Sequence, residues 1–201
     1  KQMIAVLEGF PVKAVKTGML LSAEIIDTVA ETIGESRFRG IPLIIDPVFV
    51  ATSGAQLIRD NAIQCMTGKL FPLASLITPN MQEAARLAGS PVNTVEDIER
   101  VASRLFEKFG VPVLLKGGHL EDKALDVLVD RDGTGRYESK IIKGVNNHGS
   151  GCTLASAIAA AIATGEPLRQ AIKTAKSYIN SALEQSLPLG PDLSVMNHFP
   201  G

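Results

Sequence analysis

Short apolar stretches rich in β-branched residues alternate with longer amphipathic stretches along this chain. The short stretches predict strands at residues 14–19, 41–48, 75–78 and 111–116. The second is almost unbroken in its apolar character, which is typical of a strand buried on both faces of a sheet. Strands that alternate with helices predict an α/β fold, in which helices cover both faces of a mainly parallel sheet and form a three-layer α/β/α sandwich.

Capping residues mark where the helices between these strands begin and end. An apolar stripe identifies the buried face of the first helix, at Ile25, Ile26, Val29 and Ile33. The predicted N-caps are Ser22, Asn80 and Thr94, and the predicted stops are Gly89, Gly110 and Gly165. Thr94 also has Asp97 three residues later, which is the spacing of a capping box.

The pattern changes after the fourth strand. Residues 124–129 and 136–142 predict two strands joined by Asp130-Arg131-Asp132-Gly133, a composition typical of a hairpin connection. Two further helices are expected, at residues 150–164 and from Pro167 onward. The hairpin predicts antiparallel strands at one edge of the sheet. Because the sequence contains neither an internal repeat nor a linker, residues 1–201 are expected to form a single domain.

Polar residues and glycines follow the predicted strands, where ligands of open α/β sheets bind. These segments are Lys16-Thr17-Gly18-Met19, Asp46-Pro47, Thr78-Pro79-Asn80 with Glu83, Lys116-Gly117-Gly118-His119, and residues 146–152. They bring carboxylates, an amide, an ammonium group and a glycine-rich loop to one edge of the sheet. This convergence predicts a site for an anionic ligand, with a metal ion.

The glycine-rich loop Gly149-Ser150-Gly151 directly precedes an alanine-rich helix. Its amide groups and the helix dipole predict an anion hole for a phosphate or for the charge on a transferring phosphoryl group. It is not a Walker A loop, because the pattern G-x-x-x-x-G-K-[ST] does not occur. The alternative is a glycine turn that only joins a strand to a helix.

Three oxygen-bearing residues are candidates for a magnesium site: Asp46, Asn80 and Glu83. Spacing alone favours a different interpretation of Asn80 and Glu83, as the two partners of a capping box. Asp46 is equally well explained as a strand-end residue that binds a turn. Lys116 is a candidate phosphate contact or a surface residue, and Gly117 permits close approach of a ligand or only a tight turn.

Cys152 lies in the first turn of the helix after the glycine loop, a position that lowers the pKa of a thiol. It is a candidate base, nucleophile or substrate contact, and the alternative is a small residue packed inside. His148 has the same ambiguity. Cys65 is expected to be a buried helix residue.

Composition excludes several classes of protein. The chain has 20 Lys and Arg against 21 Asp and Glu, and 45% of its residues are hydrophobic, which excludes a disordered chain. A net charge of −1 does not suit a non-specific nucleic-acid binder. Two cysteines do not make a disulfide scaffold. The most apolar window, residues 154–163, is too short to span a membrane, and residues 1–9 lack the pattern of a signal peptide.

The ordered set of motifs resembles the hydroxymethylpyrimidine/phosphomethylpyrimidine kinases of thiamine biosynthesis, in the ribokinase-like superfamily. The resemblance extends over essentially the whole chain and rests on the strand-end segments above together with Val48-Phe49-Val50, Thr52-Ser53-Gly54, Thr153-Leu154 and Asn197-His198-Phe199. It implies a ribokinase-like fold and phosphorylation of 4-amino-5-hydroxymethyl-2-methylpyrimidine, and then of its monophosphate, with ATP and Mg²⁺.

The resemblance also implies roles for individual residues. Asn80 and Glu83 match the N-x-x-E motif that organises Mg²⁺ and phosphates, and Asp46 matches a carboxylate near them. Lys116 and Gly117 match positions near the ATP phosphates, and Gly149-Ser150-Gly151 matches the anion hole. Positions near the pyrimidine are matched by Gly18, Met19 and Val50. Cys152 stands where most ribokinase-like sugar kinases carry a catalytic Asp, and it is expected to take the proton of the substrate hydroxyl.

Two departures from the family pattern bear on function. Asn147 stands where the family usually has Thr. The family also begins with a strand, a glycine-rich substrate loop and a further strand before the position of Lys1, so the N-terminal part of the usual domain is expected to be absent. One alternative is a pyridoxal kinase on the same scaffold, because some members of the superfamily with Cys at the position of Cys152 act on B6 vitamers. The other is a non-catalytic nucleotide- or pyrimidine-binding module, which the missing N-terminal part and the absent Asp base would suit. A homodimer in the cytoplasm, without nucleic-acid or membrane partners, is expected.

Overall fold

The structure is a computed structural model that describes residues 1–49, 57–120, 123–142, 144–190 and 193–201. Its main sheet has six strands in the order β1-β2-β3-β4-β5-β6. They are β1 (Val15–Thr17), β2 (Leu43–Ile45), β3 (Leu76–Ile77), β4 (Val113–Leu120), β5 (Lys123–Asp130) and β6 (Gly133–Lys140). The first four pair in parallel, and β4, β5 and β6 pair antiparallel. The mainly parallel sheet and the hairpin at one edge are both confirmed.

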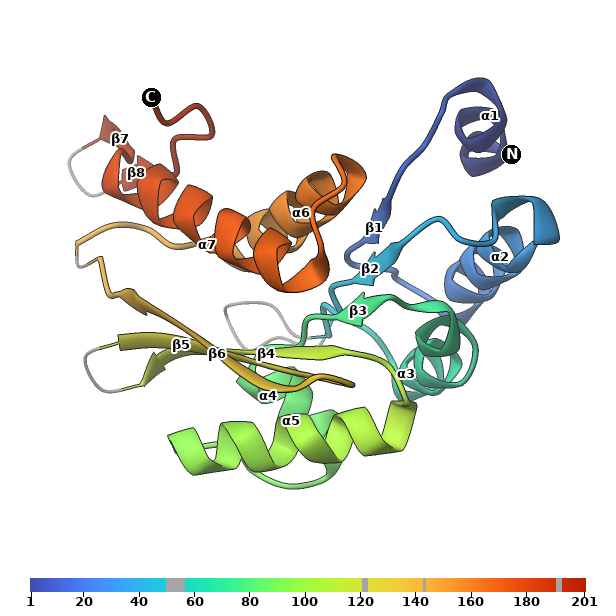
Figure 1. Ribbon diagram of the computed structural model, residues 1–201, viewed down its shortest axis with the longest axis horizontal. Coiled ribbons are helices and arrows are strands. Elements are labelled where there is room, and N and C mark those ends of the chain that lie inside the picture. Colours follow the sequence, from blue (N-terminus) through green and yellow to red (C-terminus); the bar gives the residue numbers. More distant parts are fainter. Residues whose placement is uncertain (50–56, 121–122, 143, 191–192) are drawn as a thin grey trace.

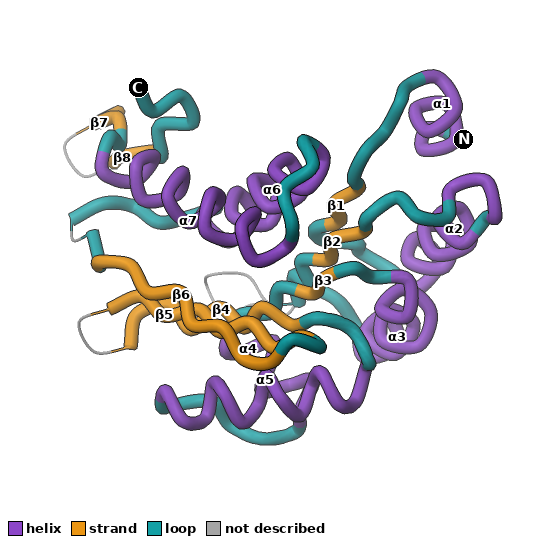
Figure 2. The backbone as a smooth tube through the Cα atoms, viewed as in Figure 1, coloured by secondary structure: helices purple, strands orange, loops and turns teal. Residues whose placement is uncertain are grey.

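Helices cover both faces of this sheet (Figures 1 and 2). They are α1 (Gln2–Gly9), α2 (Ala23–Gly34), α3 (Asp60–Cys65), α4 (Met81–Ala88), α5 (Val95–Phe109), α6 (Ser150–Ala163) and α7 (Leu168–Glu184). Three short helical turns are η1 (Ser36–Phe38), η2 (Met66–Leu70) and η3 (Phe71–Leu73). Figure 1 shows α6 and α7 on one side of the sheet and α3, α4 and α5 on the other.

Two apolar clusters fill the space between the layers. Leu43 and Ile45 of β2 pack into the cluster with α2, α4 and α5, whereas Ile44 packs into the cluster with α6 and α7. Successive residues of a strand point to opposite faces, so a strand between two helical layers must be apolar at every position. Each such side chain contributes about 1.5–3 kcal/mol of hydrophobic stabilisation when fully buried. The unbroken apolar run of the sequence is explained by this double burial.

The predicted caps hold the helices where expected. Asn80 and Thr94 form capping boxes with Glu83 and Asp97, and the hydroxyl of Ser22 accepts from the amide of Ile25 at 3.4 Å. Gly89, Gly110 and Gly165 have positive φ, the conformation that ends a helix most readily at glycine. The apolar stripe predicted for α2 was wrong at one position. Ile25 is 43% exposed, because its neighbour Ile26 takes the core-facing position of α2.

A C-terminal hairpin, β7 (Leu187–Gly190) with β8 (Leu193–Val195), was not predicted. Its leucines are largely exposed and give no alternating pattern of burial, so the sequence carried no strand signal there. Met196, directly after it, is buried in the cluster under α6 and α7.

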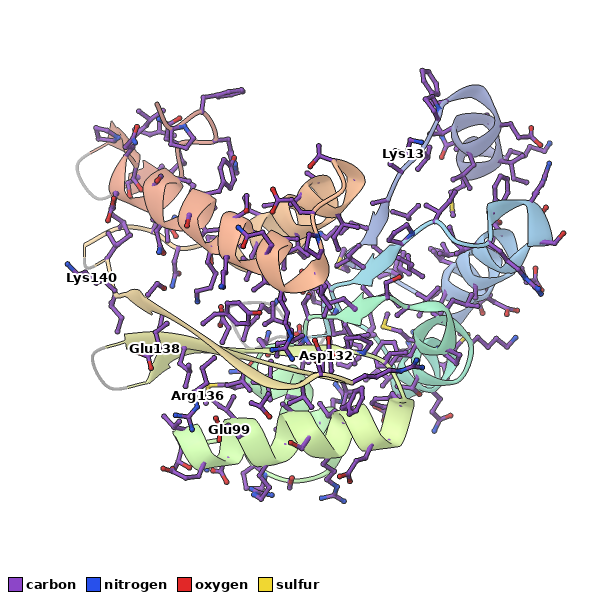
Figure 3. The ribbon with its side chains drawn as sticks, viewed as in Figure 1. Lys13, Glu99, Asp132, Arg136, Glu138 and Lys140 are labelled. Atoms are coloured by element: carbon purple, nitrogen blue, oxygen red, sulfur yellow. The ribbon has the colours of Figure 1, made fainter. Side chains whose placement is uncertain are left out.

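Some charged side chains of the outer surface form exposed ion pairs between elements. Glu99 of α5 pairs with Arg136 of β6 in this way (Figure 3). Among the described residues, none of the helices has the length and apolar character needed to cross a membrane.

Candidate active site

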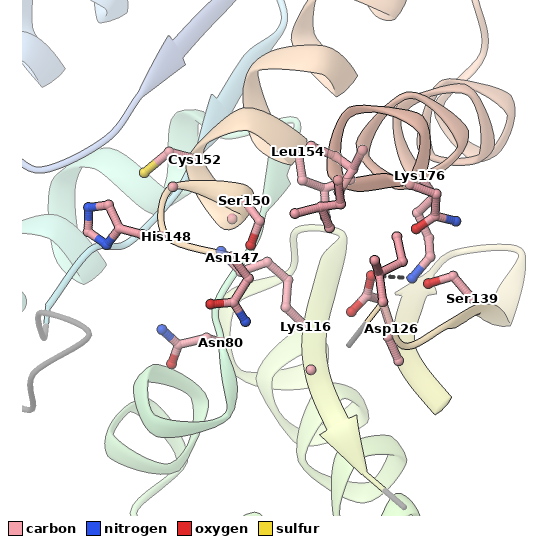
Figure 4. Close-up of a pocket in the computed structure, with 18 of the residues that line it drawn as sticks. Asn80, Lys116, Asp126, Ser139, Asn147, His148, Ser150, Cys152, Leu154 and Lys176 are labelled. Carbon is pink, nitrogen blue, oxygen red and sulfur yellow. Dashed lines mark hydrogen bonds and ion pairs between the residues drawn. The ribbon is translucent and has the colours of Figure 1, made fainter. Parts of the chain in front are cut away.

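A cleft of about 530 Å³ opens at the carboxyl ends of β2, β3 and β4, beneath α6 and α7 (Figure 4). Eight of the predicted site residues line it: Asp46, Asn80, Glu83, Lys116, Gly149, Ser150, Gly151 and Cys152. Figure 4 shows Lys116 near the middle of the cleft, with Asn80, His148 and Cys152 toward one end and Asp126, Ser139 and Lys176 toward the other. The fold therefore brings together residues that are more than a hundred positions apart in the sequence.

A buried ion pair lies on the floor of this cleft. The Lys116 ammonium is 2.7 Å from Oδ1 of Asp46, and the hydroxyl of Thr78 donates to the same oxygen at 3.1 Å. Asp46 is 1% exposed. Because an isolated charge at that depth is costly, each partner depends on the other. Lys116 itself lies where the register between β4 and β5 shifts, at the end of the regular strand pairing.

Asn80 and Glu83 form the capping box that their spacing predicts. Oδ1 of Asn80 accepts from the amide of Glu83 at 2.9 Å, and Oε2 of Glu83 accepts from the amide of Asn80 at 2.8 Å. Oε1 of Glu83 accepts from the amide of Phe49 at 3.4 Å. Burial raises the pKa of the Glu83 carboxyl to about 7, although the nearby Lys116 ammonium opposes the shift. This buried carboxylate joins α4 to the end of β2.

The glycine loop turns sharply into α6. Gly149 is the N-cap of α6 and has a φ of +83°, which favours glycine. A Cβ on Gly151 would lie 3.1 Å from Nζ of Lys116, so glycine at 151 lets the ammonium approach the first turn of the helix. The amide of Ser150 donates to the carbonyl of Asn147 at 3.1 Å within the loop. The remaining first-turn amides of α6 have no partner within the helix, as at any helix start.

The thiol of Cys152 contradicts one expectation from the sequence. Cys152 is exposed and lines the cleft, but its pKa is raised rather than lowered. Desolvation of the thiol is the larger cause, and the Asp46 carboxylate adds to it, while Lys16 and Lys116 oppose it. The neighbouring carboxylate and the desolvation outweigh the helix N-terminus, so the thiol is protonated at neutral pH.

The remaining predicted residues lie outside the described cleft. Gly18 does not line it, and Met19 is 54% exposed. Val50, with the Thr52-Ser53-Gly54 motif, lies outside the described residues. Gly117 faces β5, where a Cβ would come within 2.3 Å of the Leu125 carbonyl oxygen. The glycine is therefore required by packing, and its neighbour Gly118 lines the cleft instead.

Sequence reasoning missed a second ion pair in the cleft. Nζ of Lys176 on α7 lies 2.7 Å from Oδ2 of Asp126 on β5, and both side chains are about nine-tenths buried. The sequence did contain a signal for this pair, namely a charged residue within each of two apolar patterns. Asp126 interrupts an apolar strand between Leu125 and Val127, and Lys176 interrupts the apolar face of α7.

The described residues contain no cluster of three or more His, Cys, Asp or Glu side chains that could hold a metal ion. Asp46, Asn80 and Glu83 supply oxygens of the type that Mg²⁺ prefers, but Lys116 and the capping box already use most of them. This set fits a Mg²⁺ ion that keeps water and phosphate oxygens as most of its ligands, and does not form a cage of protein ligands.

Comparison with known proteins agrees with this architecture. The sequence model of the phosphomethylpyrimidine kinase family matches residues 1–197. The chain is 45% identical to the thiamine biosynthesis bifunctional protein ThiED of Geobacter sulfurreducens, over 98% of this chain and 40% of that protein. It is 36% identical to a hydroxymethylpyrimidine/phosphomethylpyrimidine kinase of Streptomyces coelicolor, over 98% of this chain and 72% of that protein.

Solved structures give the same result. The pyridoxal kinase of Bacillus subtilis, in an ADP complex, has a TM-score of 0.87 and 34% identity, covering 98% of this chain and 74% of its own. The phosphomethylpyrimidine kinase of Clostridium difficile has a TM-score of 0.77 and 36% identity, covering 90% of this chain and 73% of its own. The fold is therefore ribokinase-like, and the chain belongs to the phosphomethylpyrimidine kinase family.

Proposed function

We propose that this protein transfers a phosphoryl group from ATP to 4-amino-5-hydroxymethyl-2-methylpyrimidine, and then to its monophosphate, in thiamine biosynthesis. The observation that carries the proposal is the Lys116–Asp46 pair, which the fold sets against the first turn of α6 at Gly151. An ammonium group and a helix N-terminus at one point suit a transferring phosphoryl group. The relatives named for this reaction support the substrate class.

The nucleotide phosphates are assigned to the same end of the cleft. Lys116 and the loop Gly149-Ser150-Gly151 would contact them, and the ADP complex of the similar pyridoxal kinase supports nucleotide binding. Asp46, with Asn80 and Glu83, would hold Mg²⁺ mainly through water and phosphate oxygens. Mg²⁺ bound there would neutralise negative charge on the phosphates. The pyrimidine is assigned to Gly18, Met19 and Val50, on the strength of the family resemblance.

The two reactions place different demands on the protein. In the first, the hydroxyl oxygen bonds to the γ-phosphorus, the bond from that phosphorus to the ADP oxygen breaks, and the hydroxyl proton must leave. In the second, the acceptor is a phosphate that is already mostly deprotonated, so positioning and electrostatics carry most of the rate. Because the Cys152 thiol is itself protonated, we propose that it takes the hydroxyl proton while passing its own to Asp46, whose carboxylate acts on the thiol.

Replacement of Cys152 by alanine separates its roles. If Cys152 relays the hydroxyl proton, Cys152→Ala lowers kcat for the alcohol by about 10²–10⁴-fold and leaves the reaction of the monophosphate nearly unchanged. Steady-state kinetics with each acceptor measures this split, with Cys65→Ala as the matched cysteine control because Cys65 lies outside the cleft. Equal losses with both acceptors would instead assign Cys152 to substrate binding or packing.

Mass spectrometry of the products tests the function itself. The full-length protein is incubated with Mg·ATP and, separately, with the hydroxymethylpyrimidine, its monophosphate and pyridoxal. We expect the pyrimidine diphosphate from either pyrimidine. A protein that phosphorylates neither pyrimidine would contradict the proposal.

Pyridoxal kinase activity is the second candidate, because a pyridoxal kinase is among the most similar structures. The two functions are separated by kcat/KM for the hydroxymethylpyrimidine and for pyridoxal, measured on the same preparation. A larger value for pyridoxal would favour the second candidate.

The remaining parts of the proposal concern the protein as a whole. We propose that residues 1–201 act as one kinase domain, that the protein is a homodimer and that it works in the cytoplasm, where ATP is available. The exposed leucines of the β7–β8 hairpin support pairing of subunits. Light scattering of the purified full-length protein tests the dimer, and a monomer at micromolar concentration would reject it.

A further inference from the structure

Lys16 does not line the described cleft, but it lies close enough to the reacting end for its charge to act on Cys152, and the proposed mechanism does not use it. It lies in β1 and is in register with Ile44 of β2, whose side chain packs under α6 and α7. Residues in register on neighbouring parallel strands point to the same face of a sheet. Lys16 therefore projects toward the face of the sheet that α6 covers.

The ammonium of Lys16 lies at the carboxyl end of the strand. Nζ is 3.3 Å from the position that a Cβ on Gly18 would take. Its charge also acts on the thiol of Cys152, where it opposes the rise in pKa. Lys16 is thus near both Gly18, assigned to the pyrimidine, and Cys152, assigned to the hydroxyl that receives the phosphoryl group.

The charges around the cleft favour Lys16 as the ammonium available to an anion near Cys152. Lys140 also lines the cleft without an ion pair among the described residues, but it follows Ser139 at the end opposite Cys152 (Figure 4). Lys116 is neutralised by Asp46 at 2.7 Å, and Lys176 is neutralised by Asp126 at 2.7 Å. No carboxylate among the described residues forms an ion pair with Lys16. A half-buried ammonium without a counter-charge favours binding of an anion.

We propose that Lys16 binds the phosphate of the monophosphate acceptor in the second phosphorylation, an inference that rests on the proposed function. An oxygen of that phosphate attacks the γ-phosphorus of ATP, and the bond from the γ-phosphorus to the ADP oxygen breaks. The acceptor enters as a dianion, so the step transfers no proton. Lys16 offsets the charge repulsion between this dianion and the phosphates of ATP, a repulsion that the neutral alcohol does not experience.

Lys16→Met removes the charge while keeping most of the length of the side chain, and Lys16→Arg keeps the charge. The matched control is Lys13→Met, because Lys13 is an exposed lysine of the same segment, before β1 (Figure 3), and does not line the cleft. For full-length protein, we expect Lys16→Met to lower kcat/KM for the monophosphate at least about tenfold more than for the alcohol. Lys16→Arg should restore most of the loss, and Lys13→Met should match the wild type.

Calorimetric titration with the pyrimidine monophosphate, in the absence of ATP, supplies a readout that does not depend on catalysis. We expect Lys16→Met to weaken that binding by about tenfold and to weaken binding of the alcohol much less. Equal losses with the two acceptors would overturn the inference, and a larger loss with the alcohol would assign Lys16 to Cys152 instead. If the wild type acts on neither pyrimidine, the proposed function fails first, and the inference fails with it.

Discussion

Glycine at position 151 decides how close Lys116 can come to the start of α6. A Cβ there would lie 3.1 Å from Nζ of Lys116, and the same Nζ is held by Asp46 at 2.7 Å. An added methyl group must push the ammonium away from the helix or away from its counter-charge. The shift is a few tenths of an ångström, and it would lengthen the contact between the ammonium and the phosphoryl group assigned there.

Gly151→Ala is therefore expected to lower kcat for both acceptors by about 10–100-fold, because an electrostatic contact with the phosphoryl group is displaced. The free energy of unfolding should change by less than about 1 kcal/mol, since alanine is favourable in a helix. Gly68→Ala is the control, because a Cβ at Gly68 meets nothing within 4 Å and its φ is not positive. Equal kcat values for the two variants would show that Lys116 does not act from this position.

The sequence predicted which residues line the cleft better than it predicted their chemical state. Lys116, Asp46 and Cys152 were all placed at strand or helix ends, and all three line one cleft. The predicted direction of the Cys152 pKa shift was wrong, because the effect of a helix N-terminus is visible in the sequence, whereas desolvation of the thiol and a carboxylate at the end of β2 are not. Tertiary proximity decides the protonation of a residue that local sequence only positions.

At the level of single elements, local patterns predicted the most. Capping boxes at α4 and α5 were recognisable because their partners are three residues apart. The hairpin β7–β8 was missed because its pairing depends on exposed residues without an alternating pattern. The α4 box has a second consequence that the sequence does not show, since it buries the carboxylate of Glu83 to 2% exposure.

That burial makes the stability of the protein depend on pH. The pKa of Glu83 is about 7 in the folded protein, against an ordinary value of 4.5, because burial disfavours the charged form. The contribution of Glu83 to the stability of the folded protein is therefore greatest below about pH 4.5 and is lost as pH rises through 7. Between pH 5.5 and 8, without nucleotide or Mg²⁺, the wild type should lose about 2 kcal/mol of unfolding free energy relative to Glu83→Gln.

Denaturant unfolding at the two pH values measures this difference. For each protein, the change in unfolding free energy between the two pH values is compared. This comparison cancels any pH-independent cost of replacing a carboxylate oxygen by an amide nitrogen in Glu83→Gln. Asp97→Asn, in the exposed capping box of α5, provides the control, because Asp97 has a lowered pKa and should show no loss over the same range. Parallel behaviour of the wild type and Glu83→Gln would mean that the carboxylate stays ionised at little cost.

At the scale of the whole molecule, alternation of strands and helices predicted the layers, and the change of pattern after β4 predicted the antiparallel edge. What local patterns could not supply was how the α6–α7 layer is joined to that edge. The cleft opens between the two, beside the apolar cluster in which Leu128 of β5 and Tyr137 of β6 pack against α6 and α7. A buried ion pair joins the helical layer to the edge of the sheet here. Nζ of Lys176 on α7 lies 2.7 Å from Oδ2 of Asp126 on β5 (Figure 4).

Removal of one partner of this pair should destabilise the whole fold more than removal of both. Lys176→Met leaves the Asp126 carboxylate buried without a counter-charge, which should cost about 3–5 kcal/mol of unfolding free energy. The double variant Asp126→Leu with Lys176→Met should recover most of that loss, because apolar side chains replace both charges. The exposed ion pair of Arg136 and Glu99 provides the control. Arg136→Met should lower the free energy of unfolding by less than about 1 kcal/mol. Additive losses in the double variant would show instead that the two charges act independently and that apolar packing alone holds α7 to the sheet.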